Sequence, residues 1–299
     1  MTATQAVPTR AAVRLRNILF ATDFSPASDV AFPYAAGLAR MFGGNLSAVH
    51  VIEPANYTLP PETWQRDDEI LKLEMDKLRE RMIREAPHSR AEMIEREGGI
   101  WESLAETVKE NEIDLIVAGT RGRTGIGKAL LGSQAEELIR CATCPVLTIG
   151  PHVLAHGEPE GQFASILFAT DFGADSEAAA SYAAQLAREA KAKLTVLHVV
   201  KKMKSNDLAI PEQFAEADER KLRELVPDEQ QFFCAPRYMV EEGTPADKIL
   251  EMARRTHADL IVLGVHEATG FPGAATHLPI ATIHHVVAHA PCPVLTVHR

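Results

Sequence analysis

The sequence predicts an α/β protein of two tandem domains, each built on a doubly wound sheet of five parallel strands. Three observations lead to this prediction: the chain repeats itself once, apolar strand-like runs alternate with helix-like segments, and the composition is ordinary. Of the 299 residues, 46% are hydrophobic and 24% are charged, as in globular domains that fold in water. The length fits about two domains, which we expect at residues 1–150 and 151–299.

The duplication consists of four pairs of matching segments in the same order along the chain. The first pair shares the sequence ILFATDF, which begins at Ile18 and again at Ile166, 148 residues later. The other pairs are AVHVIEP with VLHVVKK, DLIVAGT with DLIVLGV, and TCPVLTIG with PCPVLTVH. A repeat of domain size predicts two domains rather than a solenoid of short repeats. Residues 150–162, rich in Gly, Pro and His, fit a linker.

Hydrophobic periodicity places the elements of the first half. Short apolar runs predict buried strands, and apolar residues spaced three and four apart predict amphipathic helices. The expected strands are 18–22, 46–52, 91–97, 113–119 and 146–149. The expected helices are 26–41, 62–85, 100–111 and 133–141. Alternating strands and helices favour a parallel sheet with right-handed crossovers, and such sheets bind ligands beyond the carboxyl ends of their strands.

Composition excludes several classes of protein. A net charge of -10 argues against a nucleic-acid partner, since phosphate backbones require clustered Lys and Arg. No apolar run approaches the length of a membrane span, and the amino terminus lacks the apolar core of a signal peptide. Four cysteines are too few for a disulfide framework. The sequence therefore predicts a cytoplasmic protein without a membrane or nucleic-acid partner.

A glycine-rich loop, GTRGRTGIGKALLGS, follows the fourth expected strand. Its spacing is G-x2-G-x9-G-S, with Gly119, Gly122, Gly132 and Ser133 at the motif positions. Glycines allow a ligand to approach the backbone closely, and the free N–H groups at a helix start attract phosphate. The stretch GRTGIGKA also resembles a Walker A loop, but Ala129 stands where a hydroxyl would bind Mg²⁺. The loop is therefore expected to hold phosphate in a different way.

The tandem ILFATDF segments, the glycine motif and the closing CPVL strands together resemble the universal stress protein family, over nearly the whole chain and twice. The resemblance implies a Rossmann-like, adenine nucleotide alpha hydrolase-like fold, with ATP and Mg²⁺ bound at the carboxyl edge of the sheet. It implies that Asp23 reaches the ribose or adenine, that backbone groups of Val51 meet adenine, and that the glycine loop holds ribose and phosphates. The candidate binding residues are Ala21, Thr22, Asp23, Val51, Gly119, Arg121, Gly122, Gly125, Lys128, Gly132, Ser133 and Gln134.

Several of these residues have simpler interpretations. Asp23 is also placed to form an Asx-turn before the following helix, and Ser133 to act only as the N-cap of its own helix. Arg121, Arg123 and Lys128 are either phosphate contacts or solvated loop residues. Val51 is expected in a strand whatever the function.

The second half has lost the glycine motif. Gly264 corresponds to Gly119, but Glu267 stands in place of Gly122, and no Gly-Ser pair follows. A carboxylate near phosphate repels it. The sequence therefore predicts one competent nucleotide site per chain, in the first half. The second half is expected to be structural, regulatory or adapted to a different ligand.

Two further patterns have both a chemical and a structural interpretation. His285 and His289 are four residues apart on one expected helix face. They are weak zinc candidates together with Glu267 or His266, a pH-responsive pair, or an ordinary polar face. Cys141 and Cys144 form C-x-x-C, which in a βαβ setting can be a redox pair. Because CPVL recurs at Cys292, a buried helix-to-strand turn explains the pattern better.

Three functions fit the sequence. The first is a stress-response protein that binds ATP and acts as a nucleotide-dependent regulator or scaffold with a protein partner. The second is an enzyme of the same fold, a slow ATPase or a nucleotidyl transferase, although the sequence offers no Walker B pair or evident general base. The third is a dimeric scaffold without nucleotide. The fifth strands, 145–149 and 293–297, are expected to pair the two halves, with a homodimer in addition.

Overall fold

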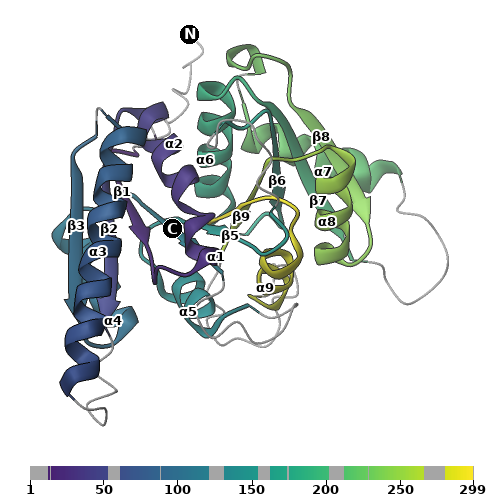
Figure 1. Cartoon of the computed structure of the whole chain (residues 1–299). Helices are drawn as coiled ribbons and strands as arrows, with labels where there is room; N and C mark the ends of the chain where they lie inside the picture. Colours follow the sequence, from purple (N-terminus) through teal and green to yellow (C-terminus); the bar gives the residue numbers. More distant parts are fainter. Residues whose placement is uncertain are drawn as a thin grey trace.

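The chain forms one continuous sheet of ten strands covered by helices on both faces (Figure 1). The computed structural model describes residues 13, 15–52, 61–87, 89–120, 131–153, 162–173, 175–201, 212–227, 229–265 and 280–298. Within these ranges no helix combines the length and the apolar composition that a bilayer crossing requires.

The sheet has the order β3-β2-β1-β4-β5-β10-β9-β6-β7-β8. The first half contributes β1 (Asn17–Ala21), β2 (Asn45–Ile52), β3 (Ala91–Glu97), β4 (Leu115–Gly119) and β5 (Val146–Ile149). The second contributes β6 (Ser165–Thr170), β7 (Lys193–Val200), β8 (Arg237–Glu242), β9 (Leu260–Gly264) and β10 (Val294–Val297). All pairs within a half are parallel, which confirms the expected fold class.

The helices follow the strands as the periodicity predicts. Those of the first half are α1 (Pro26–Asp29), α2 (Phe32–Phe42), α3 (Pro61–Glu85), α4 (Ile100–Glu110) and α5 (Ser133–Cys141). Those of the second are α6 (Ser176–Glu189), α7 (Glu212–Leu225), the short 3₁₀ helix η1 (Glu229–Gln231), α8 (Pro245–Arg255) and α9 (Ile280–His289). The expected boundaries in the first half agree to within two residues, with one exception.

The exception is the expected helix 26–41, which is two helices. α1 ends at Asp29, and α2 begins at Phe32 with Pro33 in its first turn. Pro33 has no N–H to donate to the carbonyl of Asp29, and its ring clashes with that carbonyl in a continuous helix. The prediction of one helix was therefore wrong at this proline.

The two halves join through their fifth strands. β5 and β10 pair antiparallel, with Leu147 opposite Leu295. The Thr148 hydroxyl donates to the Val294 carbonyl at 3.1 Å, and the Thr296 hydroxyl donates to the Val146 carbonyl at 3.2 Å. This confirms the expected pairing of the halves, and it leaves β3 and β8 as the two edges of the sheet.

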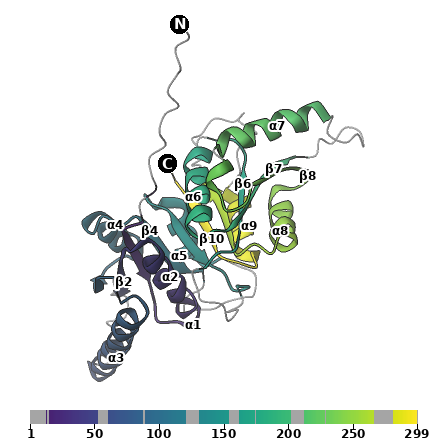
Figure 2. The same ribbon diagram turned by 90° about the horizontal axis from the view of Figure 1, so that it is seen from above.

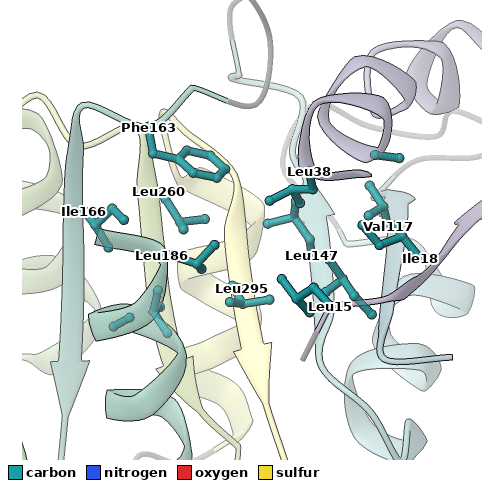
Figure 3. Close-up of a cluster of buried hydrophobic side chains, with 14 of the residues drawn as sticks. Leu15, Ile18, Leu38, Val117, Leu147, Phe163, Ile166, Leu186, Leu260 and Leu295 are labelled. Atoms are coloured by element: carbon teal, nitrogen blue, oxygen red, sulfur yellow. The ribbon is translucent and has the colours of Figure 1, made fainter. Parts of the chain in front are cut away.

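The hydrophobic core continues across the junction on the face covered by α2 and α6 (Figures 2 and 3). Side chains from both halves belong to one buried cluster there: Leu15, Leu38 and Leu147 from the first half, and Phe163, Leu186 and Leu295 from the second. Because apolar burial is the main stabilising term in folding, this shared core holds the halves together independently of the strand pairing.

Candidate functional site

A cavity of about 210 Å³ lies at the carboxyl ends of β1, β2 and β4, beside α5. Eight of the predicted binding residues line it: Ala21, Thr22, Asp23, Val51, Gly119, Gly132, Ser133 and Gln134. The other four, Arg121, Gly122, Gly125 and Lys128, lie outside the described residues. The structure thus brings together segments that are more than 100 residues apart in the sequence.

The cavity has an apolar wall and a polar rim. The wall is formed by aliphatic side chains from the strands, α4 and α5: Val49, Val51, Ile100, Leu104 and Leu138. The rim carries backbone and hydroxyl groups, and Asp23 is the one charged side chain among the described residues that line the cavity. A site of this kind suits a ligand with a flat apolar ring and a polar tail.

The start of α5 forms one side of the rim. The N–H of Gly132 donates to the Thr120 carbonyl at 3.1 Å, so the two ends of the glycine loop meet. A Cβ atom on Gly132 would lie 3.1 Å from the same carbonyl oxygen, so a side chain there would crowd that oxygen. Gly132 is the N-cap and Ser133 is the first helical residue, so the interpretation of Ser133 as the N-cap is wrong. The N–H groups of this first helical turn, which have no partner within the helix, lie at the cavity wall.

Asp23 forms the Asx-turn that the sequence suggests. Its Oδ1 accepts from the N–H of Ser25 at 2.9 Å, while the Thr22 hydroxyl oxygen accepts from the N–H of Phe24 at 3.0 Å. Phe24 has a φ of 57°, a left-handed conformation that costs energy for a bulky residue. These bonds hold the turn in a fixed shape and place the Asp23 side chain in the cavity wall.

Two polar residues that support this turn were not predicted. The buried His50 Nδ1 lies 2.8 Å from the Thr22 carbonyl oxygen, and its ring lies against that of Phe24, with centroids 4.9 Å apart. The Ser28 hydroxyl lies 3.1 Å from that of Thr22. The sequence does contain a signal for His50, because the repeated segments AVHV and VLHV share a histidine in an otherwise apolar strand.

The second half repeats this turn at the end of β6. His198 Nδ1 lies 2.8 Å from the Thr170 carbonyl oxygen, the Thr170 hydroxyl donates to that of Ser176 at 2.7 Å, and Asp171 Oδ1 accepts from the N–H of Gly173 at 2.8 Å. The turn is therefore part of the duplicated scaffold. The sequences of the halves differ in the loop after the fourth strand, where residues 121–130 and residues 266–279, with Glu267, lie outside the described residues.

The histidines of α9 contact one another. The His285 and His289 rings stack with centroids 4.3 Å apart, and His289 Nδ1 lies 2.9 Å from the His285 carbonyl oxygen. Among the described residues, no group of three or more His, Cys, Asp or Glu side chains is placed to hold a metal ion. The pair thus gains no third ligand in the part of the chain that the structure describes, and the candidates His266 and Glu267 lie outside it.

The buried cysteines are expected to be unreactive. All four cysteines are free, and burial, reinforced by the charge of Asp114, raises the pKa of Cys144 to about 12. Burial and the charge of Asp259 likewise raise the pKa of Cys292 to about 12. At pH 8 the thiolate fraction is then on the order of one in ten thousand, which disfavours a Cys141–Cys144 redox couple.

Alkylation of the native protein with iodoacetamide at pH 8, followed by peptide mass spectrometry, checks this expectation. Cys144 and Cys292 should remain unmodified until guanidinium unfolds the protein. Rapid labelling of native Cys144 would show that its thiolate is accessible.

Comparison with known proteins agrees with these features. The model of the universal stress protein family matches residues 14–150 and again residues 162–298. A universal stress protein of Mycolicibacterium smegmatis is 28% identical over 272 residues, which cover 86% of this chain and 89% of the relative. One of Methanocaldococcus jannaschii is 33% identical over 140 residues, 45% of this chain and 81% of the relative.

Among solved structures, a universal stress protein from Archaeoglobus fulgidus shares the fold along the whole chain. It aligns with a TM-score of 0.74 at 21% identity, covering 96% of this chain and 97% of the other. Because the family model accounts for both halves of the sequence and the fold agrees over the full length, the chain belongs to the universal stress protein family, with two family domains in tandem.

Proposed function

We propose that the first half binds ATP, with Mg²⁺, and that the chain acts as a nucleotide-dependent regulator or scaffold in the cytoplasmic stress response. The observation that carries this proposal is the cavity into which an apolar wall, the Asp23 turn and the start of α5 all face. These three surfaces suit an adenine ring, a ribose and a phosphate chain, respectively.

The lining residues suggest how the ligand lies. Adenine would pack against Val51 and the aliphatic wall, within reach of the backbone at the end of β2. The ribose hydroxyls would donate to the carboxylate of Asp23, and the phosphates would lie at the N-terminus of α5, where the helix dipole favours negative charge. Gly132 and Ser133 are the described residues at that end.

The second half is proposed to bind no nucleotide of this kind. A Cβ atom on Gly264 would lie 3.2 Å from the backbone of Asp175, so the end of β9 and the start of α6 are in close contact. Asp175 is 6% exposed, so its side chain is buried beside the end of β9.

The proposal also includes slow ATP hydrolysis at most, and a homodimer. Asp23 is the one described lining residue with a carboxylate, and its Oδ1 is engaged in the Asx-turn, so any ATP hydrolysis is expected to be slow. β5 and β10 pair within the chain, so a homodimer would have to form through another surface.

The substitution Asp23→Asn tests the proposed ribose contact. The asparagine keeps the side-chain oxygen that caps the turn, so the free energy of unfolding in urea should remain within about 0.5 kcal/mol of the wild-type value. ATP affinity should fall about tenfold or more, because a hydrogen bond to a charged acceptor contributes roughly 1.5–3 kcal/mol.

The matched variant Asp23→Ala, which also loses the turn, should lose both stability and affinity. Isothermal titration calorimetry with ATP and Mg²⁺ provides the readout. Unchanged affinity in Asp23→Asn would remove Asp23 from the binding site and leave it the structural role alone.

A further inference from the structure

The helix at the rim of the nucleotide cavity, α5, contacts the rest of the protein through two different faces. Ala135 and Leu138 of α5 line the cavity. Glu136 and Ile139 are three residues apart, so they share a different face of the same helix. That second face points toward the other half of the chain, and α5 and α9 lie side by side in both overall views (Figures 1 and 2).

Ile139 is anchored in the core of the second half. Its side chain is fully buried, and it belongs to a cluster whose other buried members among the described residues all come from residues beyond 160, including Ile283, Val286 and Val287 of α9. Its neighbour Leu138 packs instead in the core of the first half. The two consecutive residues of α5 therefore connect two different cores.

Leu131, which precedes the part of the cavity proposed to hold phosphate, also packs against the core of the second half. The next residue, Gly132, is the N-cap of α5 and lines the cavity. A displacement of Leu131 would carry the Gly132 N–H away from the Thr120 carbonyl, which holds the loop ends together.

A polar contact and a close backbone approach complete the interface. Nδ1 of His284 on α9 lies 3.6 Å from Oε1 of Glu136, and its buried Nε2 has no hydrogen-bond partner among the residues that the structure describes. A Cβ atom on Gly150 would lie 2.9 Å from the Val287 carbonyl oxygen. α9 thus lies directly against the end of β5 as well as beside α5.

We infer that the second half is a brace for the nucleotide site of the first: the core around α9 fixes α5, and through it the position of Gly132, Ser133 and Gln134. This inference rests on the proposed ATP site. It assigns Ile139 and His284 as positioning residues, and it gives the half without the glycine motif a function. Because linkage is reciprocal, ATP bound in the first half would in turn tighten the packing of α9 on α5.

Two pairs of variants in the full-length protein test the inference. Ile139→Ala removes the anchor of α5, while Ile249→Ala removes an equally buried isoleucine from the same cluster on α8. His284→Ala removes the contact with Glu136 without emptying the core, while His285→Ala changes the exposed neighbour on the same helix. Each is assayed for ATP affinity and for hydrogen exchange of the amides of residues 133–138 without ligand.

The two isoleucine variants should lose stability alike, but only Ile139→Ala should speed exchange in the first turns of α5 and weaken ATP binding, by about fivefold or more. Ile139→Leu should restore both. His284→Ala should weaken binding by about twofold to fivefold, with His285→Ala unchanged.

The inference is overturned if Ile139→Ala matches Ile249→Ala in both readouts, or, should Ile139→Ala not fold, if His284→Ala matches His285→Ala. The exchange measurement keeps this result separate from the proposed function. If the wild-type protein fails to bind ATP, the proposed function fails, whereas faster exchange of α5 in the two test variants would still support the brace.

Discussion

Replacing Ser133 with Glu is expected to weaken ATP binding by about a hundredfold or more, because like charges brought together in a binding site cost several kcal/mol. Ser133 is the first residue of α5 and lines the cavity. A carboxylate there would occupy the place proposed for phosphate and neutralise the favourable field of the helix start.

The same substitution should not harm the fold. An acidic side chain in the first turn of a helix stabilises the helix by about 0.3–1 kcal/mol, so Ser133→Glu should unfold at an equal or higher urea concentration. Ser133→Gln, which has the same shape and no charge, is the matched control and should lose far less affinity. If the Glu and Gln variants bind ATP equally well, the phosphates do not lie at α5.

The largest loss of stability is expected from Phe163→Ala, at the junction of the halves. Phe163 is 2% exposed and packs with Leu38, Leu186 and Leu295 in the shared core (Figure 3). Truncating a buried phenylalanine removes its transfer free energy and leaves a cavity, at a cost of about 3–5 kcal/mol.

Urea unfolding followed by circular dichroism measures this loss. Phe233, which is 75% exposed, provides the control: Phe233→Ala should change the free energy of unfolding by less than about 0.5 kcal/mol. A cost for Phe163→Ala as small as that of the control would mean that the halves do not share a packed core.

The strands and most helices could be predicted because each carries its own periodic signal. The apolar runs that became β1 and β4 are short and largely buried, and the two copies of ILFATDF made the duplication plain. Pro33 is the local cause of the break between α1 and α2. Hydrophobic periodicity does not reveal this break, because buried residues continue from one helix into the next.

The residues of the candidate site that lie at the ends of the strands could be predicted for a different reason. Parallel strands bring their carboxyl ends to one edge, so Asp23, Val51 and Gly119 had to lie near one another once the sheet was known. The histidine shared by AVHV and VLHV marks His50 in the sequence. Its supporting role does not follow from that pattern, because the role depends on a hydrogen bond to the backbone at the end of another strand.

The packing of the second half against α5 could not be predicted from the sequence. The spacing of Leu138 and Ile139 shows that α5 is apolar on more than one side, but not which core each side meets. That partner is set by the antiparallel pairing of β5 with β10, which brings α9 beside α5. An interaction between segments so far apart in the chain leaves no local pattern.

The stoichiometry of ATP binding tests the central claim most directly. Isothermal titration calorimetry of the full-length protein with ATP and Mg²⁺ should give one bound nucleotide per chain, and Ser133→Glu in the first half should weaken its binding by about a hundredfold or more. Two nucleotides per chain, or one whose affinity Ser133→Glu leaves unchanged, would contradict a single site in the first half, and no binding at all would contradict the nucleotide site itself.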